Sequence, residues 1–217
     1  MVDVLYEELR HQILIGEEQP GSVLTEVSLA TRYSVARPTA KAAVERLVAD
    51  GLVVRLRRGA GASVRLLTPA DVDDLYETRI LVESAVNASL ARRTTEVNGA
   101  QIANDQLIAA AAESRATGIV SADIAFHKAL VAKVGGVRLM RLHDQLMGEA
   151  HFCMAQVQEL QLLSARQIAS EHAEILAAVR RGDEHAATAL TIAHLDRART
   201  RLLEHIAATS DDQPQFA

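Results

Sequence analysis

Asp123 and His127 are four residues apart in a stretch whose apolar residues recur at helical spacing. This separation puts both side chains on one face of a helix, and Leu130 and Val131 continue that face. A carboxylate and an imidazole on an apolar face must be paired or ligated, because leaving them there without partners costs several kcal/mol. The chain must therefore fold so that other polar groups reach this helix face.

Two later histidines have the same kind of surroundings. His172 is followed by Ile175, and His194 by Leu195, each in a helical pattern. Three imidazoles and one carboxylate from three helices suit a divalent cation, for which we expect Zn²⁺, with Ni²⁺ or Mn²⁺ as alternatives. The competing interpretation is three unrelated core histidines with ordinary hydrogen-bond partners. Four such residues together favour a metal site. Its expected ligands are Asp123, His127, His172 and His194.

Charge is distributed unevenly along the chain. The net charge of −5 excludes a uniformly basic nucleic-acid-binding protein. Between Arg32 and Arg65, however, eight Lys and Arg residues stand against only Glu45 and Asp50, a local charge of +6. A basic segment inside an acidic chain predicts a surface that faces phosphate groups.

Neither the cysteine content nor the N-terminus indicates secretion. Cys153 is the only cysteine, so no disulfide can form within the chain. The first residues lack the basic and then apolar layout of a signal peptide, and no apolar run is long enough to span a bilayer. We therefore expect a cytoplasmic protein with no membrane partner.

Residues 1–67 have the pattern of a winged helix-turn-helix domain. Apolar spacing and turn residues predict three helices, over about 4–15, 25–33 and 37–50. Two short strands, 52–56 and 63–67, follow and are joined by a glycine-containing hairpin tip, 57–61. In this fold the third helix enters the major groove of DNA, and its first turn contacts base edges.

The first turn of the third predicted helix offers several DNA contacts. Arg37 can donate two hydrogen bonds to a guanine, whereas Thr39 and Lys41 can hold phosphates or single base atoms. Arg58 and Gly59 at the hairpin tip are the candidates on the wing. The alternative is a solvated basic helix face, but the helix–helix–hairpin context favours binding to double-stranded operator DNA.

Residues 68–209 predict a second domain made only of helices, and residues 210–217 a disordered tail. Thr68 is the expected cap of the first helix, and Pro69 its first residue. Six helices are expected, with a break at Gly118, and their cores cover about 69–92, 96–115, 119–134, 137–162, 165–181 and 184–209. The predicted fold class is therefore mainly α, a winged helix-turn-helix followed by an antiparallel helical bundle.

Arg79 lies on the apolar stripe of the first helix of this second domain. An inward-facing guanidinium needs an anion, which is either Glu83 one turn later or a ligand from outside. In the second case Arg79, Glu83 and His151 are the candidates for binding a small organic carboxylate effector beside the metal. In the first case Arg79 and Glu83 form a structural pair.

Four runs in residues 1–67 are similar to GntR-type regulators. They are Leu5–Arg10, Pro20–Glu26, Val35–Lys41 and Leu47–Val53, which resemble the start of the domain, the recognition helix and the entry to the wing. Two positions differ. Ala36 stands where the family has Ser or Thr, so a helix cap is missing, and Lys41 stands where Arg is usual.

The second domain resembles the FCD effector-binding domain of the FadR branch of these regulators, in particular the VanR-like subgroup. The resemblance rests on Asp123-x-x-Phe126-His127, Glu171-His172, Gly182-Asp183 and His194-Leu195. It implies that the four residues named above are the metal ligands and that Arg79 holds an effector carboxylate. A Gly-Asn pair of the family is replaced here by Gly135-Gly136, at a helix cap.

The sequence predicts a ligand-responsive transcriptional regulator. We expect a repressor that binds DNA as a homodimer, because one winged helix covers only a half-site. Two alternatives stay open. A metal with free coordination positions could activate water in a hydrolase or lyase. The metal could also itself be the effector.

Overall fold

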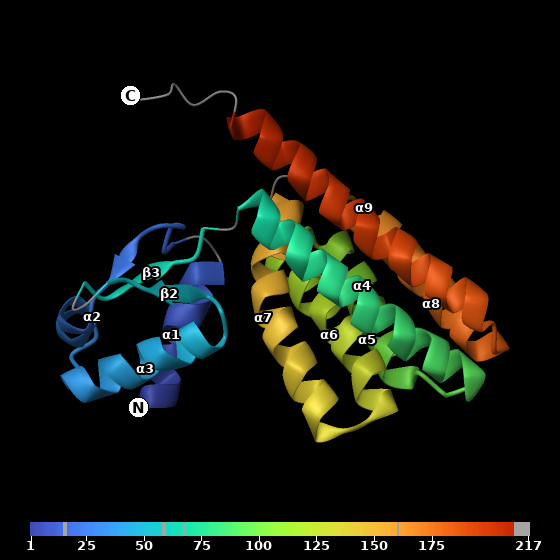
Figure 1. The fold of residues 1–217 in the computed structure, drawn as a ribbon, viewed down its shortest axis with the longest axis horizontal. Helices are drawn as coiled ribbons and strands as arrows, with labels where there is room; N and C mark the ends of the chain where they lie inside the picture. Colours follow the sequence, from blue (N-terminus) through green and yellow to red (C-terminus); the bar gives the residue numbers. More distant parts are fainter. Residues whose placement is uncertain (15–16, 58–59, 67, 160, 211–217) are drawn as a thin grey trace. The chain divides into compact units, whose positions relative to one another are not determined.

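The computed structural model describes residues 1–14, 17–57, 60–66, 68–159 and 161–210. The chain divides into two compact units, Met1–Leu67 and Thr68–Ala217 (Figure 1). Of the predicted tail, Ser210 ends the last helix, and 211–217 lie outside the described residues. No helix in the described ranges is long and apolar enough to cross a membrane.

The first unit is a winged helix-turn-helix. Its elements are α1 (Val2–Leu14), β1 (Val23–Leu24), α2 (Glu26–Arg32), α3 (Arg37–Ala49), β2 (Val53–Arg55) and β3 (Ala62–Val64). Helices α1 and α2 both pack against α3. The three strands form an antiparallel sheet in the order β1-β3-β2. The core consists of apolar side chains from all three helices and the sheet, such as Leu9, Val44 and Val64.

Strand β1 was not expected from the sequence. It is only two residues long and pairs with β3, where Val23 lies opposite Ser63. Gly61 makes this pairing possible, because its φ is +89° and a Cβ there would lie 2.5 Å from the carbonyl oxygen of Leu24. A strand of two residues is too short to show the alternation of apolar and polar residues by which strands are predicted.

The second unit is an all-helical bundle. Its helices are α4 (Pro69–Arg92), α5 (Asn98–Ala112), α6 (Ala116–Val134), α7 (Val137–Glu159), α8 (Ala165–Arg181) and α9 (Glu184–Ser210). Figure 1 shows α4 beside α9, and α5 packs against both α6 and α8. A core that includes Leu90, Phe126, Leu130 and Leu176 joins these helices. The fold class predicted from the sequence is confirmed.

Side-chain caps fix several of the predicted helix starts. Thr68 accepts a hydrogen bond from the Asp71 amide, and Asp71 bonds back to the Thr68 amide, so the two form a capping box. Thr25 and Ser164 cap α2 and α8 in a similar way. Helix α3 starts after Ala36 without a side-chain cap, as the sequence indicated.

The expected break at Gly118 was wrong. Helix α6 begins at Ala116, and the chain turns earlier, at Ser114, whose φ is +55°. Gly118 instead lets two helices approach, because a Cβ there would lie 3.0 Å from the Cβ of Ala110 on α5. The sequence pattern predicted a helix break at this glycine, whereas the missing side chain allows α5 and α6 to pack closely.

Candidate metal centre

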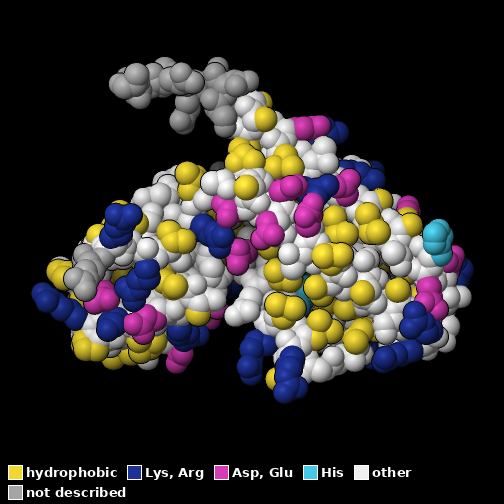
Figure 2. All heavy atoms as spheres, viewed as in Figure 1, with side chains coloured by type: hydrophobic (Ala, Val, Ile, Leu, Met, Phe, Trp, Pro, Cys, Tyr) yellow, Lys and Arg dark blue, Asp and Glu magenta, His cyan; other side chains and the backbone are white. Residues whose placement is uncertain are grey.

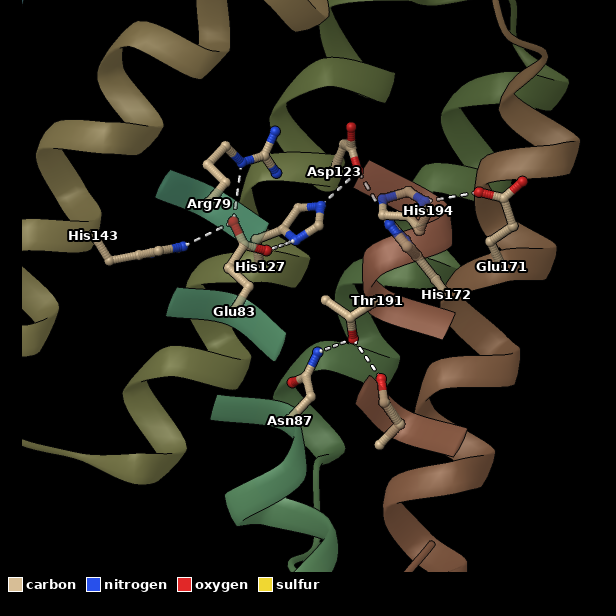
Figure 3. Close-up of polar contacts among 11 residues, drawn as sticks. Arg79, Glu83, Asn87, Asp123, His127, His143, Glu171, His172, Thr191 and His194 are labelled. Atoms are coloured by element: carbon tan, nitrogen blue, oxygen red, sulfur yellow. Dashed lines mark hydrogen bonds and ion pairs between the residues drawn. The ribbon is translucent and has the colours of Figure 1, made fainter. Parts of the chain in front are cut away.

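Four side chains from three helices meet inside the second unit. Asp123 and His127 come from α6, His172 from α8 and His194 from α9 (Figure 3). One ligand-type atom from each lies within 4.8 Å of the others, and all four residues are buried. The sequence named these four residues, and the fold brings them together.

Each imidazole is held through its Nδ1 atom by a different acceptor. His127 Nδ1 lies 2.6 Å from Glu83 Oε2, and His194 Nδ1 lies 2.8 Å from Glu171 Oε2. The third contact, 3.2 Å long, joins His172 Nδ1 to the side-chain oxygen of Asn104. When Nδ1 carries the donated proton, Nε2 is the atom available to a ligand. The three Nε2 atoms therefore face the centre of the cluster.

The amide of Asn104 has its orientation fixed independently. Its Nδ2 donates to the carbonyl oxygen of Ala169 at 3.0 Å, so Oδ1 must be the atom that accepts from His172. With its proton on Nδ1, His172 presents a lone pair at Nε2, 3.2 Å from the Asp123 carboxylate. Two acceptors at this distance repel each other unless a cation or a proton lies between them.

The buried donor atoms support the same conclusion. Asp123 Oδ1, His127 Nε2 and His172 Nε2 are fully buried and have no hydrogen-bond partner. Buried polar atoms are almost always satisfied, so three unsatisfied atoms that face one another need an explanation. One carboxylate oxygen and three imidazole nitrogens are a donor set that divalent transition metals accept. The residues present therefore fit a metal ion.

The protonation states also suit a cation. Burial lowers the pKa of His172 to about 3 and that of His194 to about 4, so both imidazoles are neutral at pH 7. Burial also lowers the pKa of His127, but the charge of Glu83 and the hydrogen bonds to Asp123 and Glu83 together outweigh burial and raise it to about 9. Burial raises the pKa of Asp123, yet the neighbouring His127 and His172 bring it below its ordinary value. A bound cation would displace the second proton of His127.

Glu83 pairs with Arg79, as one of the two interpretations of the sequence predicted, and it also contacts two histidines. Its Oε1 accepts from Arg79 Nε at 3.0 Å and lies 3.4 Å from His143 Nε2, while its other oxygen holds His127. The structural pair of Arg79 and Glu83 therefore exists. Arg79 is only 1% exposed, and its Nη2 has no hydrogen-bond partner. One nitrogen of the guanidinium is thus still available to an anion.

A small cavity lies beside the cluster. Its walls include Tyr76, Arg79, Asp123, Met154 and His194, and its volume is about 20 Å³. This is room for about one water molecule or ion, and not for an organic acid without rearrangement. Neither Glu83 nor His151, both predicted to contact an effector, is among the residues that line it. His151 lies on α7 and is partly buried.

Sequence reasoning did not identify Asn104 or Glu171 as part of this arrangement, and it considered His143 only as one residue of a helix face that could line a pocket. Glu171 precedes His172 and was noted only as part of a family mark. Asn104 lies on a helix whose sequence carries no chemical signal of its own, and nothing in the sequence links His143 to Glu83. Their roles depend on which helices become neighbours, so only the tertiary structure assigns them.

The predicted DNA-contacting residues lie in the first unit. The side chain of Arg37 is exposed at the start of α3 and has no ion pair or hydrogen bond with any described residue. Thr39 is half-buried, and Lys41 is exposed with its Nζ 3.9 Å from Glu45 Oε1. The predictions for Arg58 and Gly59 fall outside the described residues.

The fold defines a winged helix-turn-helix unit, of the class that binds DNA, followed by a separate helical domain. Sequence models of two families match the chain. Residues 2–64 match "Bacterial regulatory proteins, gntR family", and residues 74–197 match the FCD domain. The chain therefore belongs to the GntR family of bacterial transcriptional regulators and carries an FCD domain. This family consists of regulators and not enzymes, which removes the hydrolase or lyase alternative. Membership of the VanR-like subgroup stays a prediction from the sequence.

Individual relatives agree with this assignment. An uncharacterized HTH-type transcriptional regulator from the TAR-I ttuE-ttuC' intergenic region of Agrobacterium vitis is 30% identical over 136 residues, covering 60% of this chain and 79% of the relative. The gluconate operon transcriptional repressor of Bacillus licheniformis is 33% identical over 89 residues, which is 41% of this chain and 36% of that protein. The crystal structure of a GntR transcriptional regulator from Rhodococcus sp. RHA1 has a TM-score of 0.79 and 28% identity, covering 94% and 97% of the two chains.

Proposed function

We propose that this GntR-family protein is a repressor that senses a small organic carboxylate at a divalent metal ion. The metal would be held by Asp123, His127, His172 and His194, with Zn²⁺ as the expected ion and Ni²⁺ or Mn²⁺ as alternatives. The observation that carries the proposal is the set of buried ligand atoms without partners, combined with an acceptor on every Nδ1. Such acceptors orient histidine ligands in metal sites.

The proposal that the effector carries a carboxylate is supported by a further polar group that lines the cavity. Arg79, whose Nη2 has no hydrogen-bond partner, lines the same small cavity as Asp123 and His194. Guanidinium groups bind carboxylates with charge-assisted hydrogen bonds, and a metal with an open position would hold a second oxygen of the ligand. Met154 forms part of the wall and has an unbranched side chain that can change rotamer to widen the cavity. The relative from Bacillus licheniformis is named as the repressor of a gluconate operon, and gluconate is a hydroxycarboxylate.

Isothermal calorimetry of the metal-loaded protein against hydroxy and dicarboxylic acids tests this proposal. At least one acid should bind, and it should release the protein from operator DNA in gel shifts. Saturable binding without any effect on DNA would contradict the regulatory role. If none of the acids bound, the proposal that the effector is a carboxylate would be contradicted.

One observation favours a second candidate, in which the metal is the only effector. The cavity of about 20 Å³ is close in size to a single water molecule or ion. In that case DNA binding should change when chelator is added in the absence of any organic acid, and organic acids should then add nothing.

Asn104 gives a test of the metal centre that leaves all four ligands in place. Asn104→Leu should weaken metal affinity roughly 10- to 100-fold, because His172 loses the acceptor that orients it. Asn104→Asp keeps an acceptor and should lie closer to wild type. Competition against a chromophoric chelator measures both affinities. Unchanged affinity in Asn104→Leu would show that His172 does not need this acceptor.

Arg37 gives the corresponding test of DNA recognition. We propose that α3 enters the major groove and that a homodimer reads two half-sites. Arg37→Ala should then lose about 1–3 kcal/mol of discrimination between the selected operator and random DNA. Lys41→Ala should instead weaken binding to all sequences alike and reduce the salt dependence. Operators selected from random duplexes and fluorescence anisotropy provide the measurement. Full specificity in Arg37→Ala would move base recognition elsewhere, for example to the wing.

A further inference from the structure

Four charged side chains form a chain of ion pairs between α3 and the wing. Lys41 Nζ lies 3.9 Å from Glu45 Oε1, and Arg55 Nη2 lies 3.5 Å from that same oxygen. Arg55 also contacts Glu26 at the start of α2, with 3.5 Å between Nη1 and Oε1. Cations and acids therefore alternate along the series Lys41, Glu45, Arg55 and Glu26, which we call the ion-pair chain.

With α3 in the major groove, as proposed above, the ion-pair chain would lie beside the DNA backbone. Its members line a shallow hollow between α2, α3 and β2, together with Thr25 and Gly61. The side chains of Lys41 and Glu45 are 57% and 56% exposed, so a phosphate could reach them. On the face of the first unit that Figure 2 shows, Lys and Arg side chains lie among acidic ones.

Arg37 differs from the two cations of the ion-pair chain. It lies on the same helix as Lys41, one turn earlier, but its side chain has no ion pair or hydrogen bond with any residue in the described ranges. The cation that the proposed placement of α3 puts against bases is therefore free, whereas Lys41 and Arg55, which that placement puts near the DNA backbone, already pair with a carboxylate.

We propose that Glu45 is a specificity-determining residue that competes with DNA phosphates for Lys41 and Arg55. Phosphate contacts supply almost all of the affinity for non-specific DNA, while base contacts add to it only at the correct site. A carboxylate that occupies two backbone-facing cations therefore weakens non-specific binding and increases the relative importance of Arg37. Exposed ion pairs of this length are weak, so phosphates can replace Glu45 at the correct site, where the base contacts hold the DNA backbone in a fixed register against α3, whereas random DNA lacks those contacts. This inference rests on the proposed placement of α3 in the major groove.

The test uses Glu45→Gln in the full-length chain, with a random-sequence duplex as the ligand. The amide keeps the size of the side chain and removes its charge. Binding at about 0.1 M salt should become roughly five- to tenfold tighter, and the slope of log K against log salt should steepen by about one, because one more phosphate contact forms. Fluorescence anisotropy over a salt series gives both values. In a Lys41→Ala background the gain should be reduced.

The matched control is Glu17→Gln, which removes the same charge from an exposed position outside the ion-pair chain. It should change non-specific affinity much less than Glu45→Gln does. Equal effects of the two variants would overturn the inference, because only the overall charge would then matter. Weaker binding of Glu45→Gln to selected sites alone would also overturn it, since Glu45 would then accept a hydrogen bond from a base. If Arg37→Ala kept full specificity, the placement of α3 would fail, and the role of Glu45 would fail with it.

Discussion

His172→Ala should abolish stoichiometric metal binding while the helical fold is kept. Wild-type protein should carry about one divalent ion per chain, because Asp123 and three histidines complete a four-ligand set. His172 would supply one of these ligands through its Nε2, which lies 3.2 Å from Asp123 Oδ1. Elemental analysis of purified protein gives the metal content, and circular dichroism checks the fold.

Metal binding should also have a large effect on the stability of the protein. A ligand present at about a thousand times its dissociation constant adds about 4 kcal/mol to the free energy of unfolding. For a unit of this size, this corresponds to a rise in Tm on the order of 10 °C. Chelator should therefore lower the Tm of the wild type and leave His172→Ala unchanged.

His185→Ala is the matched control for this experiment. His185 is an exposed histidine on α9, the same helix as His194. Its replacement should preserve both the metal content and the effect of chelator on Tm. If the wild type contained no metal and chelator had no effect, the four residues would be ordinary core side chains.

Arg79→Lys should reduce affinity for the effector carboxylate roughly 10- to 100-fold, since hydrogen bonds to charged groups contribute about 1.5–3 kcal/mol. Lysine keeps the positive charge beside Glu83 but lacks the planar guanidinium, so one group can no longer serve both Glu83 and a ligand. Alanine is less suitable, because it would leave the buried Glu83 carboxylate without its cation and destabilise the fold. Calorimetry with the acid identified for the wild type measures the loss.

Two controls separate this effect from damage to the metal centre. Arg79→Lys should keep its metal, because none of the four ligands is changed. Arg92→Lys lies on the same helix, where Arg92 makes an exposed pair with Glu184, and should bind the acid as the wild type does. Equal affinities of wild type and Arg79→Lys would contradict the proposed pocket and leave Arg79 as a structural partner of Glu83.

Much of the local structure could be predicted from short-range patterns. Thr25, Thr68 and Ser164 act as helix caps, since a cap depends on backbone amides two or three residues away. Errors arose where a residue's role depends on a distant segment. Gly118 packs against α5 instead of breaking a helix, and β1 exists only because Gly61 lets β3 approach it.

The candidate site divides in the same way. The sequence by itself determined the types of the four ligands and their placement on apolar helix faces, because helical periodicity relates Asp123 to His127 and puts His172 and His194 among apolar neighbours. Only the tertiary structure decided that Asn104 and Glu171 hold two of the imidazoles and that Glu83 lies behind His127. These partners come from helices far apart in the chain, and hydrogen bonds at about 3 Å depend on helix packing, which no local pattern specifies.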